Sequence, residues 1–121
     1  MIVPIDMKRE KDNIYLLEMW GQLRKSDLKT CEERLAGEIN RVGPVKLLFN
    51  LTGFEGWEAR SDWNDLSFYV KHGDSIQQIA IVGDDKWKSQ AMMFAGAGLR
   101  KASVEYFPES ELTKARTWLS S

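Results

Sequence analysis

Two short apolar runs near the middle of the chain constrain its fold more than any other feature. Residues 45–50 and 76–82 are nearly unbroken in apolar side chains, which is typical of parallel strands that are covered on both faces. Residues 104–107 form a shorter run of the same kind. Helical patterns fill the stretches between these runs and close the chain. Strands that alternate with helices indicate an α/β domain.

The remaining strands are predicted at the N-terminus. Residues 2–7 and 14–20 are apolar and rich in β-formers, and a charged segment, KREKDN, separates them. This arrangement predicts an antiparallel hairpin. With 121 residues, the chain is long enough for one core, and we expect a single domain over residues 1–121.

The first helix is predicted from its apolar spacing and its end signals. Ser26 and Asp27 offer N-cap chemistry, apolar residues then recur at steps of three and four, and Gly43 with Pro44 gives a stop signal. Cys31 falls on the apolar stripe. We therefore expect a buried structural thiol rather than a reactive one. Further helices are predicted at residues 58–71, 86–99 and 109–119.

Charge and cysteine content exclude several classes of protein. Seventeen basic and eighteen acidic residues leave a net charge of -1, so no global field recruits nucleic acid or an anionic membrane. The single cysteine cannot form an internal disulfide, and the N-terminal residues lack a signal-peptide pattern. No run approaches the ~18 apolar residues of a spanning helix. We expect a cytoplasmic protein, with a peripheral position at the inner membrane face left open.

The loops NLTGFEGW and GDDK follow the two central strands. The carboxyl ends of parallel strands meet at one edge of a sheet, where ligand crevices form. We therefore expect the first loop to face Asp84, Asp85 and Trp87, with two aromatic residues flanking a small acidic pocket. Gly53 and Gly56 permit positive φ and close backbone approach. The loop is predicted to be a hinge between the sheet edge and a movable aromatic helix, although a plain tight turn uses the same glycines.

Five segments carry a resemblance to a known family: LLFNLTGFEGW, the helix that ends in YVKHG, IAIVGDDKW, VEYF and ARTWL. Together they cover nearly the whole chain and resemble the bacterial SpoIIAA-like family. That family is a relative of the STAS fold of sulphate transporters and anti-sigma factor antagonists, and it is also similar to the lipid-binding CRAL-TRIO architecture. The resemblance implies a mixed sheet of about five strands, an antiparallel N-terminal hairpin with the remainder parallel, flanked by about four helices.

The resemblance also implies a regulatory turn that this chain alters. Sporulation STAS proteins carry a phosphorylatable serine in an Asp-Ser-Ser-Gly turn after the third strand, and phosphate there controls binding to an anti-sigma kinase. Here the turn reads GFEG, and the next serine is Ser61. Glu55 supplies a permanent charge that cannot be switched. Thr52 and Ser61 are poor substitutes for the phosphorylated serine.

Members of the resembled family are instead discussed as binders of apolar ligands or as membrane-associated proteins, with open and closed placements of the helix after this loop. Trp57 and Phe68 are predicted to lie in line on the outer face of the helix at residues 58–71, opposite a core stripe of Ala59, Trp63, Leu66 and Val70. Isolated exposed aromatic residues are ordinary on soluble proteins, so a purely structural reading stays open.

The helix predicted at residues 86–99 has more apolar surface than one sheet contact uses. Met92 and Met93 are adaptable apolar side chains, and Lys86 and Lys88 can reach lipid phosphates. The alternative is that this helix packs between the sheet and the closing helix. Asp84 and Asp85, at its start, are predicted chiefly as helix-capping groups.

Signals for catalysis are weak. His72 precedes Gly73 at a helix end, which favours a structural or solvent-facing role. One histidine and one cysteine give no metal-ligand spacing, and no cofactor motif is present. An acidic pocket that includes Glu55 and Glu58 with Asp62 and Asp65 leaves a hydrolase as a remote alternative.

The sequence therefore predicts a non-catalytic module without metal or cofactor. Its partner is an apolar small molecule or lipid, with contact to a membrane surface; the alternative is a STAS-like regulatory domain that binds a protein or forms a homodimer. No nucleic acid is expected. The predicted ligand-binding residues are Asn50, Thr52, Gly53, Phe54, Glu55, Gly56, Trp57, Trp63, Phe68, Asp84 and Trp87. The predicted membrane or partner contacts are Trp57, Phe68, Lys86, Lys88, Met92 and Met93.

Overall fold

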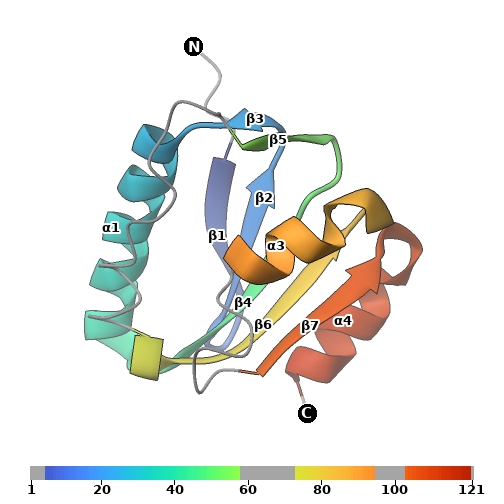
Figure 1. Ribbon diagram of the computed structural model, residues 1–121. Helices are drawn as coiled ribbons and strands as arrows, with labels where there is room; N and C mark the ends of the chain where they lie inside the picture. The colour runs from blue at the N-terminus through green and yellow to red at the C-terminus, as the bar shows by residue number, and fades with distance from the viewer. Residues whose placement is uncertain (1–4, 58–72, 95–102, 121) are drawn as a thin grey trace.

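A five-stranded mixed sheet organises the protein (Figure 1). The computed structural model describes residues 5–57, 73–94 and 103–120. The strand order is β1-β2-β4-β6-β7. β1 pairs antiparallel with β2, and the other neighbours are parallel, as predicted. The strands are β1 (Ile5–Lys11), β2 (Ile14–Met19), β4 (Val45–Asn50), β6 (Ile76–Gly83) and β7 (Ser103–Pro108).

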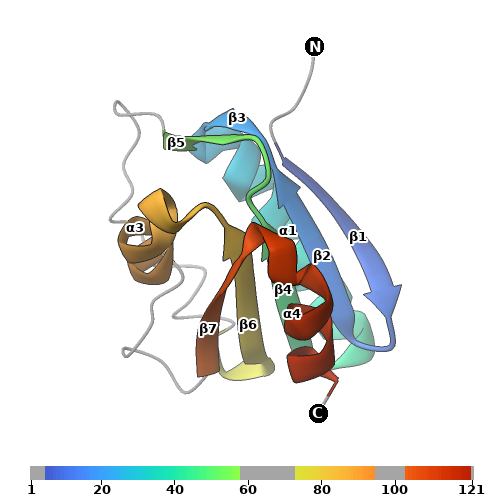
Figure 2. The ribbon, with the colours of Figure 1, turned by 90° about the vertical axis from the view of Figure 1, so that its right-hand side faces the viewer.

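Helices cover both faces of the sheet. The described helices are α1 (Lys25–Val42), α3 (Lys88–Phe94) and α4 (Leu112–Leu119), with short 3₁₀ turns η1 (Gly73–Ser75), η2 (Asp85–Trp87) and η3 (Glu109–Glu111). Figure 2 shows α3 and α4 on opposite sides of the sheet. One core cluster joins α1 and α3 to the sheet, and the other lies beneath α4. β4 and β6 contribute to both clusters, which confirms that they are central strands.

A small second sheet was not predicted. β3 (Gly21–Leu23) and β5 (Phe54–Trp57) pair in parallel. The sequence FEGW is therefore a strand, and the prediction that Trp57 belongs to a helical line with Phe68 is wrong. Residues 21–23 lie about thirty positions away along the chain. Local periodicity could not reveal this pairing, because its partner is distant in sequence.

The charged residues after the first apolar run belong to a strand rather than to the hairpin loop. Residues 8–11 continue β1, and Asp12, with a positive φ of 50°, makes the turn. β1 lies at the sheet edge, where charged side chains are tolerated and discourage edge-to-edge association. Lys8 Nζ lies 3.8 Å from Glu18 Oε1 on the neighbouring strand. The predicted boundary of residues 2–7 was wrong for this reason.

The first helix follows its predicted pattern except at its beginning. It starts at Lys25, and Asp27 accepts a hydrogen bond from Arg24 Nε at 2.8 Å instead of capping the helix. It ends before Gly43, as predicted. Cys31 is buried, and this burial raises the pKa of its thiol to about 11. The prediction of a buried thiol is confirmed.

The other predicted helices are met in part. The first part of the helix predicted at residues 86–99 appears as η2 followed by α3, and residues 95–99 lie outside the described residues. The closing helix appears as η3 followed by α4, with Ala115 and Leu119 buried. Arg116 on α4 pairs with Glu10 on β1 at 2.8 Å. The predicted helix at residues 58–71 and His72 lie outside the described residues. Among the helices that the structure describes, none is long and apolar enough to cross a membrane.

Candidate functional site

The parallel pairing of β4 and β6 brings two loops to one edge of the sheet. The Leu51 amide donates to the Val82 carbonyl at 2.8 Å, so the chain leaves both strands side by side. The exposed residues of these loops are Thr52, Gly53, Glu55, Asp84, Asp85 and Lys86. We call this group the loop edge. It confirms the expected neighbourhood of the two loops.

Hydrogen bonds within the first loop and to Gly21 hold that loop in place. Asn50 Oδ1 accepts from the Thr52 amide at 3.1 Å and from the Thr52 hydroxyl at 2.7 Å. The Phe54 amide donates to the Leu51 carbonyl at 2.9 Å, and the Gly21 amide donates to the Gly53 carbonyl at 3.0 Å. Asn50 thus builds the turn with its side-chain oxygen rather than offering it to a ligand.

The second loop is fixed by Asp84 and by the neighbouring strand. Asp84 Oδ1 accepts from the Lys86 amide at 2.9 Å, which confirms its capping role. Tyr106 Oη on β7 donates to the Asp84 carbonyl at 2.6 Å. A Cβ atom on Gly83 would lie 2.9 Å from both Leu51 Cβ and Tyr106 Oη. The absence of a side chain at Gly83 therefore lets the two loops and β7 meet.

Burial and the nearby carboxylates of the loop edge raise the pKa of Tyr106. Burial, followed by the carboxylates of Asp84, Asp85 and Glu109, raises the pKa of Tyr106 to about 12. Each of these effects favours the neutral phenol. The hydroxyl therefore keeps the proton that it donates to the Asp84 carbonyl throughout the physiological range.

Three aromatic rings lie behind the loop edge. The centroid of Phe54 is 4.8 Å from that of Trp57 and 5.3 Å from that of Trp87, and the two tryptophans are 6.0 Å apart, all edge to face. A Cβ atom on Gly56 would lie 3.2 Å from Trp87 Cη2. We call these three rings the aromatic cluster. The rings pack on one another, and a small acidic pocket flanked by aromatic residues stays a prediction.

Helix α3 presents part of the predicted membrane or partner contact. Met93 is 80% exposed, and Lys86 and Lys88 are also exposed. Lys86 Nζ lies 5.4 Å from the centroid of the Trp87 ring, within cation–π range. Met92 is half-buried against the core below α1 and α3. Trp63 and Phe68, the remaining predicted site residues, lie outside the described residues.

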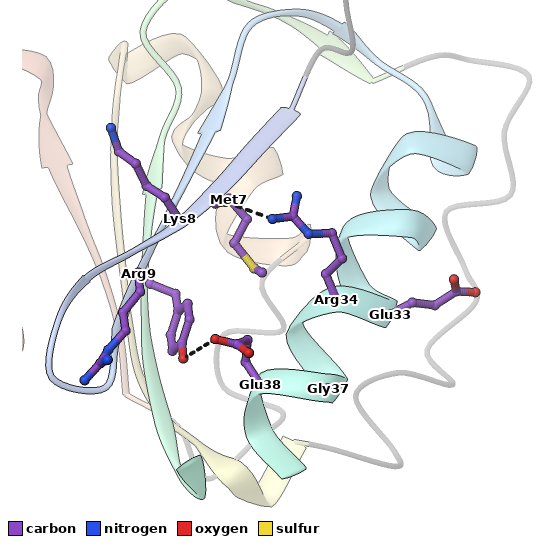
Figure 3. Close-up of a pocket in the computed structure, with 8 residues that line it drawn as sticks. Met7, Lys8, Arg9, Glu33, Arg34, Gly37 and Glu38 are labelled. Atoms are coloured by element: carbon purple, nitrogen blue, oxygen red, sulfur yellow. Dashed lines mark hydrogen bonds between the residues drawn. The ribbon is translucent and has the colours of Figure 1, made fainter. Parts of the chain in front are cut away.

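Sequence reasoning missed a groove between β1 and α1 (Figure 3). Two cavities, of about 490 and 350 Å³, share Met7 and Arg34 in their linings. The larger is also lined by Lys8, Arg9, Tyr15, Glu33, Gly37 and Glu38, and the smaller by Ile5, Asp6, Asp27, Thr30 and Cys31. Gly37, in the middle of an otherwise regular helix pattern, was the one available signal.

Residues 5–57, 73–94 and 103–120 contain no candidate metal-binding site. No group of three or more histidine, cysteine, aspartate or glutamate side chains there is arranged to hold a metal ion. Asp84, one of the acidic residues of the loop edge, accepts a hydrogen bond from the Lys86 amide and so caps the turn that follows it.

Comparison with known proteins identifies relatives of the chain and of its fold. The sequence model of the SpoIIAA-like family matches residues 14–120. An uncharacterised protein with a SpoIIAA-like fold from Shewanella loihica PV-4 has a TM-score of 0.72 at 21% identity, over 95% of this chain and 91% of that one. No curated protein sequence matches the chain.

Two solved structures of SpoIIAA share the fold at very low sequence identity. The anti-sigma factor antagonist SpoIIAA in its unphosphorylated form has a TM-score of 0.63 at 6% identity, over 94% of this chain and 97% of that one. The phosphorylated form of the Bacillus cell fate determinant SpoIIAA has a TM-score of 0.58 at 8% identity, over 91% and 96%. These two similarities establish the architecture.

Replacing Gly56 with alanine tests the packing of the aromatic cluster. We expect Gly56→Ala to lower the free energy of unfolding by about 1–3 kcal/mol, because the new Cβ is crowded by Trp87 and the residue has a φ of +107°. Gly53→Ala is the matched control, since its φ is +80° but its nearest contact is 3.8 Å. Equal losses in urea denaturation would show that the ring contact adds nothing to the backbone strain.

The pKa of Tyr106 predicts a decline of stability at high pH. The folded-state pKa of about 12 exceeds the ordinary tyrosine value of 10.0, so the stabilisation is complete below pH 10 and is lost as the pH rises toward 12. The free energy of unfolding of the wild type should therefore fall more steeply across this range than that of Tyr106→Phe. Titration of tyrosine absorbance should lose a step near pH 12 in the variant. Parallel stability curves would contradict the assignment.

Proposed function

The chain belongs to the SpoIIAA-like family, and from this premise we propose that it is a non-catalytic interaction module that binds a protein partner through its loop edge. The observation that carries the proposal is the construction of this edge. Its two loops are fixed by their own hydrogen bonds, while six neighbouring residues stay exposed. A surface that is ordered before binding loses little conformational entropy when a partner docks.

The charge of the loop edge indicates the chemistry of the partner. Glu55, Asp84 and Asp85 supply three exposed carboxylates, against the single ammonium group of Lys86. Exposed charge pairs contribute little affinity individually, but complementary patches steer association and exclude wrong partners. We therefore assign a partner with a basic patch.

Comparison with SpoIIAA supports a regulatory role for this edge. That protein is an anti-sigma factor antagonist and has been solved with and without phosphate. Here Glu55 lies on β5, just after the turn that follows β4, and the Thr52 hydroxyl donates to Asn50 Oδ1 in that turn. A carboxylate supplies charge that does not depend on a kinase. The proposed binding is therefore constitutive rather than phosphate-switched.

The proposal is tested by reversing charges at the loop edge. Tagged protein should capture a partner from extracts of the cells that produce it, and Glu55→Lys combined with Asp85→Lys should reduce the captured amount about tenfold, since repulsion replaces attraction at two contacts. Glu105→Lys, an exposed carboxylate on β7, is the control and should leave capture unchanged. Equal amounts of captured partner with all three proteins, measured by quantitative mass spectrometry, would contradict the proposal.

A second candidate function is contact with a lipid-like molecule or a membrane surface through α3. One observation favours it: Met93 is largely exposed, with Lys88 on the same helix and Lys86 just before it. An apolar side chain framed by cations suits the boundary between lipid headgroups and acyl chains. This candidate ranks second because single exposed apolar residues are common.

Vesicle flotation and native mass spectrometry test the second candidate. The protein should float with phosphatidylglycerol vesicles, and Met93→Ser should reduce the floating fraction severalfold, because it removes the apolar contact while keeping both lysines. Gln90→Ser, an exposed polar change on the same helix, should have no effect. A protein that stays at the bottom of the gradient, and whose native mass equals that of the bare chain, would eliminate both lipid readings.

A further inference from the structure

The edge strand β1 offers backbone groups beside the groove. The Met7 carbonyl accepts from Arg34 on α1 at 3.5 Å, a long hydrogen bond (Figure 3). In the part of the chain that the structure describes, β1 is the edge strand and pairs with β2, so every second residue of β1 directs its backbone groups away from β2. Backbone groups alternate in direction along a strand. Those of Ile5 and Arg9 therefore point the same way as those of Met7. An extended peptide can add a strand to an edge of this kind.

The two cavities are spaced as alternate side chains of such a peptide require. The smaller lies beside Ile5 and Met7, and the larger beside Met7 and Arg9. Along β1 they are thus displaced by two residues, which is the repeat at which side chains return to one face of a strand. Arg34 lines both cavities and stands at their junction.

Gly37 gives an independent indication that the larger cavity receives a partner. It lies inside α1, where glycine is less favourable than alanine. A Cβ atom built on it would meet nothing within 4 Å among residues 5–57, 73–94 and 103–120. Packing within the described part of the chain therefore does not require a glycine there. A side chain that entered the cavity would pass close to the backbone of Gly37, which no side chain covers.

The charges that line the larger cavity favour an acidic side chain. Arg9 Nε donates to the Asp12 carbonyl at 2.6 Å, and Arg34 Nη2 donates to the Met7 carbonyl at 3.5 Å. Glu38 is already engaged: hydrogen bonds from Arg41 and Tyr15 lower the pKa of its carboxyl to about 2. The carboxylate of Glu33 points away from β1 (Figure 3). The two guanidinium groups are thus available to a carboxylate.

The smaller cavity has a different character. Ile5, Met7 and Cys31 are buried side chains in its lining. Asp27, which also lines it, is paired with Arg24 at 2.8 Å. A small apolar side chain fits these surroundings better than a charged one.

We propose that the groove between β1 and α1 docks an extended segment of a partner protein, which adds a strand to β1 and places an apolar and an acidic side chain, two residues apart, in the two cavities. This surface differs from the loop edge. A variant that loses binding at the groove can therefore still be tested for binding at the loop edge, and the reverse also holds.

The experiment uses the full-length ¹⁵N-labelled protein and the synthetic peptide acetyl-Ser-Thr-Val-Thr-Glu-Thr-Ser-amide. Saturable NMR shift changes are expected at the amides of Met7, Arg9 and Gly37, but not at Thr52 or Asp85. A peptide with lysine in place of glutamate should bind at least fivefold more weakly. Arg34→Gln should abolish this preference, since it removes the cation shared by the two cavities.

Two variants separate binding from folding. Gly37→Leu should abolish peptide binding by filling the larger cavity while raising the melting temperature, because leucine is the better helix former. Asn40→Leu, an exposed position on α1 that lines neither cavity, should leave binding intact.

Four results would each overturn the proposal. These are the absence of saturable shifts, shifts confined to the loop edge, undiminished binding by Gly37→Leu, and β1 amide shifts that depend on protein concentration without peptide. The last result would show that a second copy of the chain occupies the edge.

Discussion

The burial of β4 and β6 on both faces is the constraint on which the rest of the structure depends. Leu48 and Ala80 face the cluster beneath α4, while Leu47 and Ile79 face the cluster beneath α1 and α3. A strand with two apolar faces is stable only between two layers. Once such strands run parallel, their carboxyl ends share one edge, and the loops that follow them must meet there. The position of the loop edge is therefore a consequence of core packing.

This dependence explains why much of the fold could be predicted. The apolar run at residues 45–50 matches β4, and the run at residues 76–82 differs from β6 by one residue. The capping role of Asp84 could also be foreseen, because it needs only a local hydrogen bond to Lys86. Signals that act within a few residues, or that reflect burial on both faces, can be interpreted from one sequence.

The parts that were missed depend on contacts between distant segments. Phe54, Trp57 and Trp87 could be placed near one another, but their edge-to-face packing follows from the pairing of β5 with β3. Without that pairing, FEGW resembles a loop. The charged end of β1 was misinterpreted for a related reason: an edge strand can carry consecutive charges that a central strand could not. The groove beside β1 could not be predicted from the sequence, because Lys8 and Arg9, which line it, were expected in a loop rather than in the strand.

Gly56 and Gly37 show why a residue type alone does not identify a site. At Gly56 the Trp87 ring occupies the space of a side chain, so the fold itself accounts for the glycine. At Gly37 no described residue occupies that space, and glycine there costs about 0.5–1 kcal/mol relative to alanine in a helix interior. The contact that we propose between Gly37 and a partner segment would account for this unfavourable helix propensity. The two glycines are equivalent in the sequence, and only the structure separates a packing requirement from an unfilled surface.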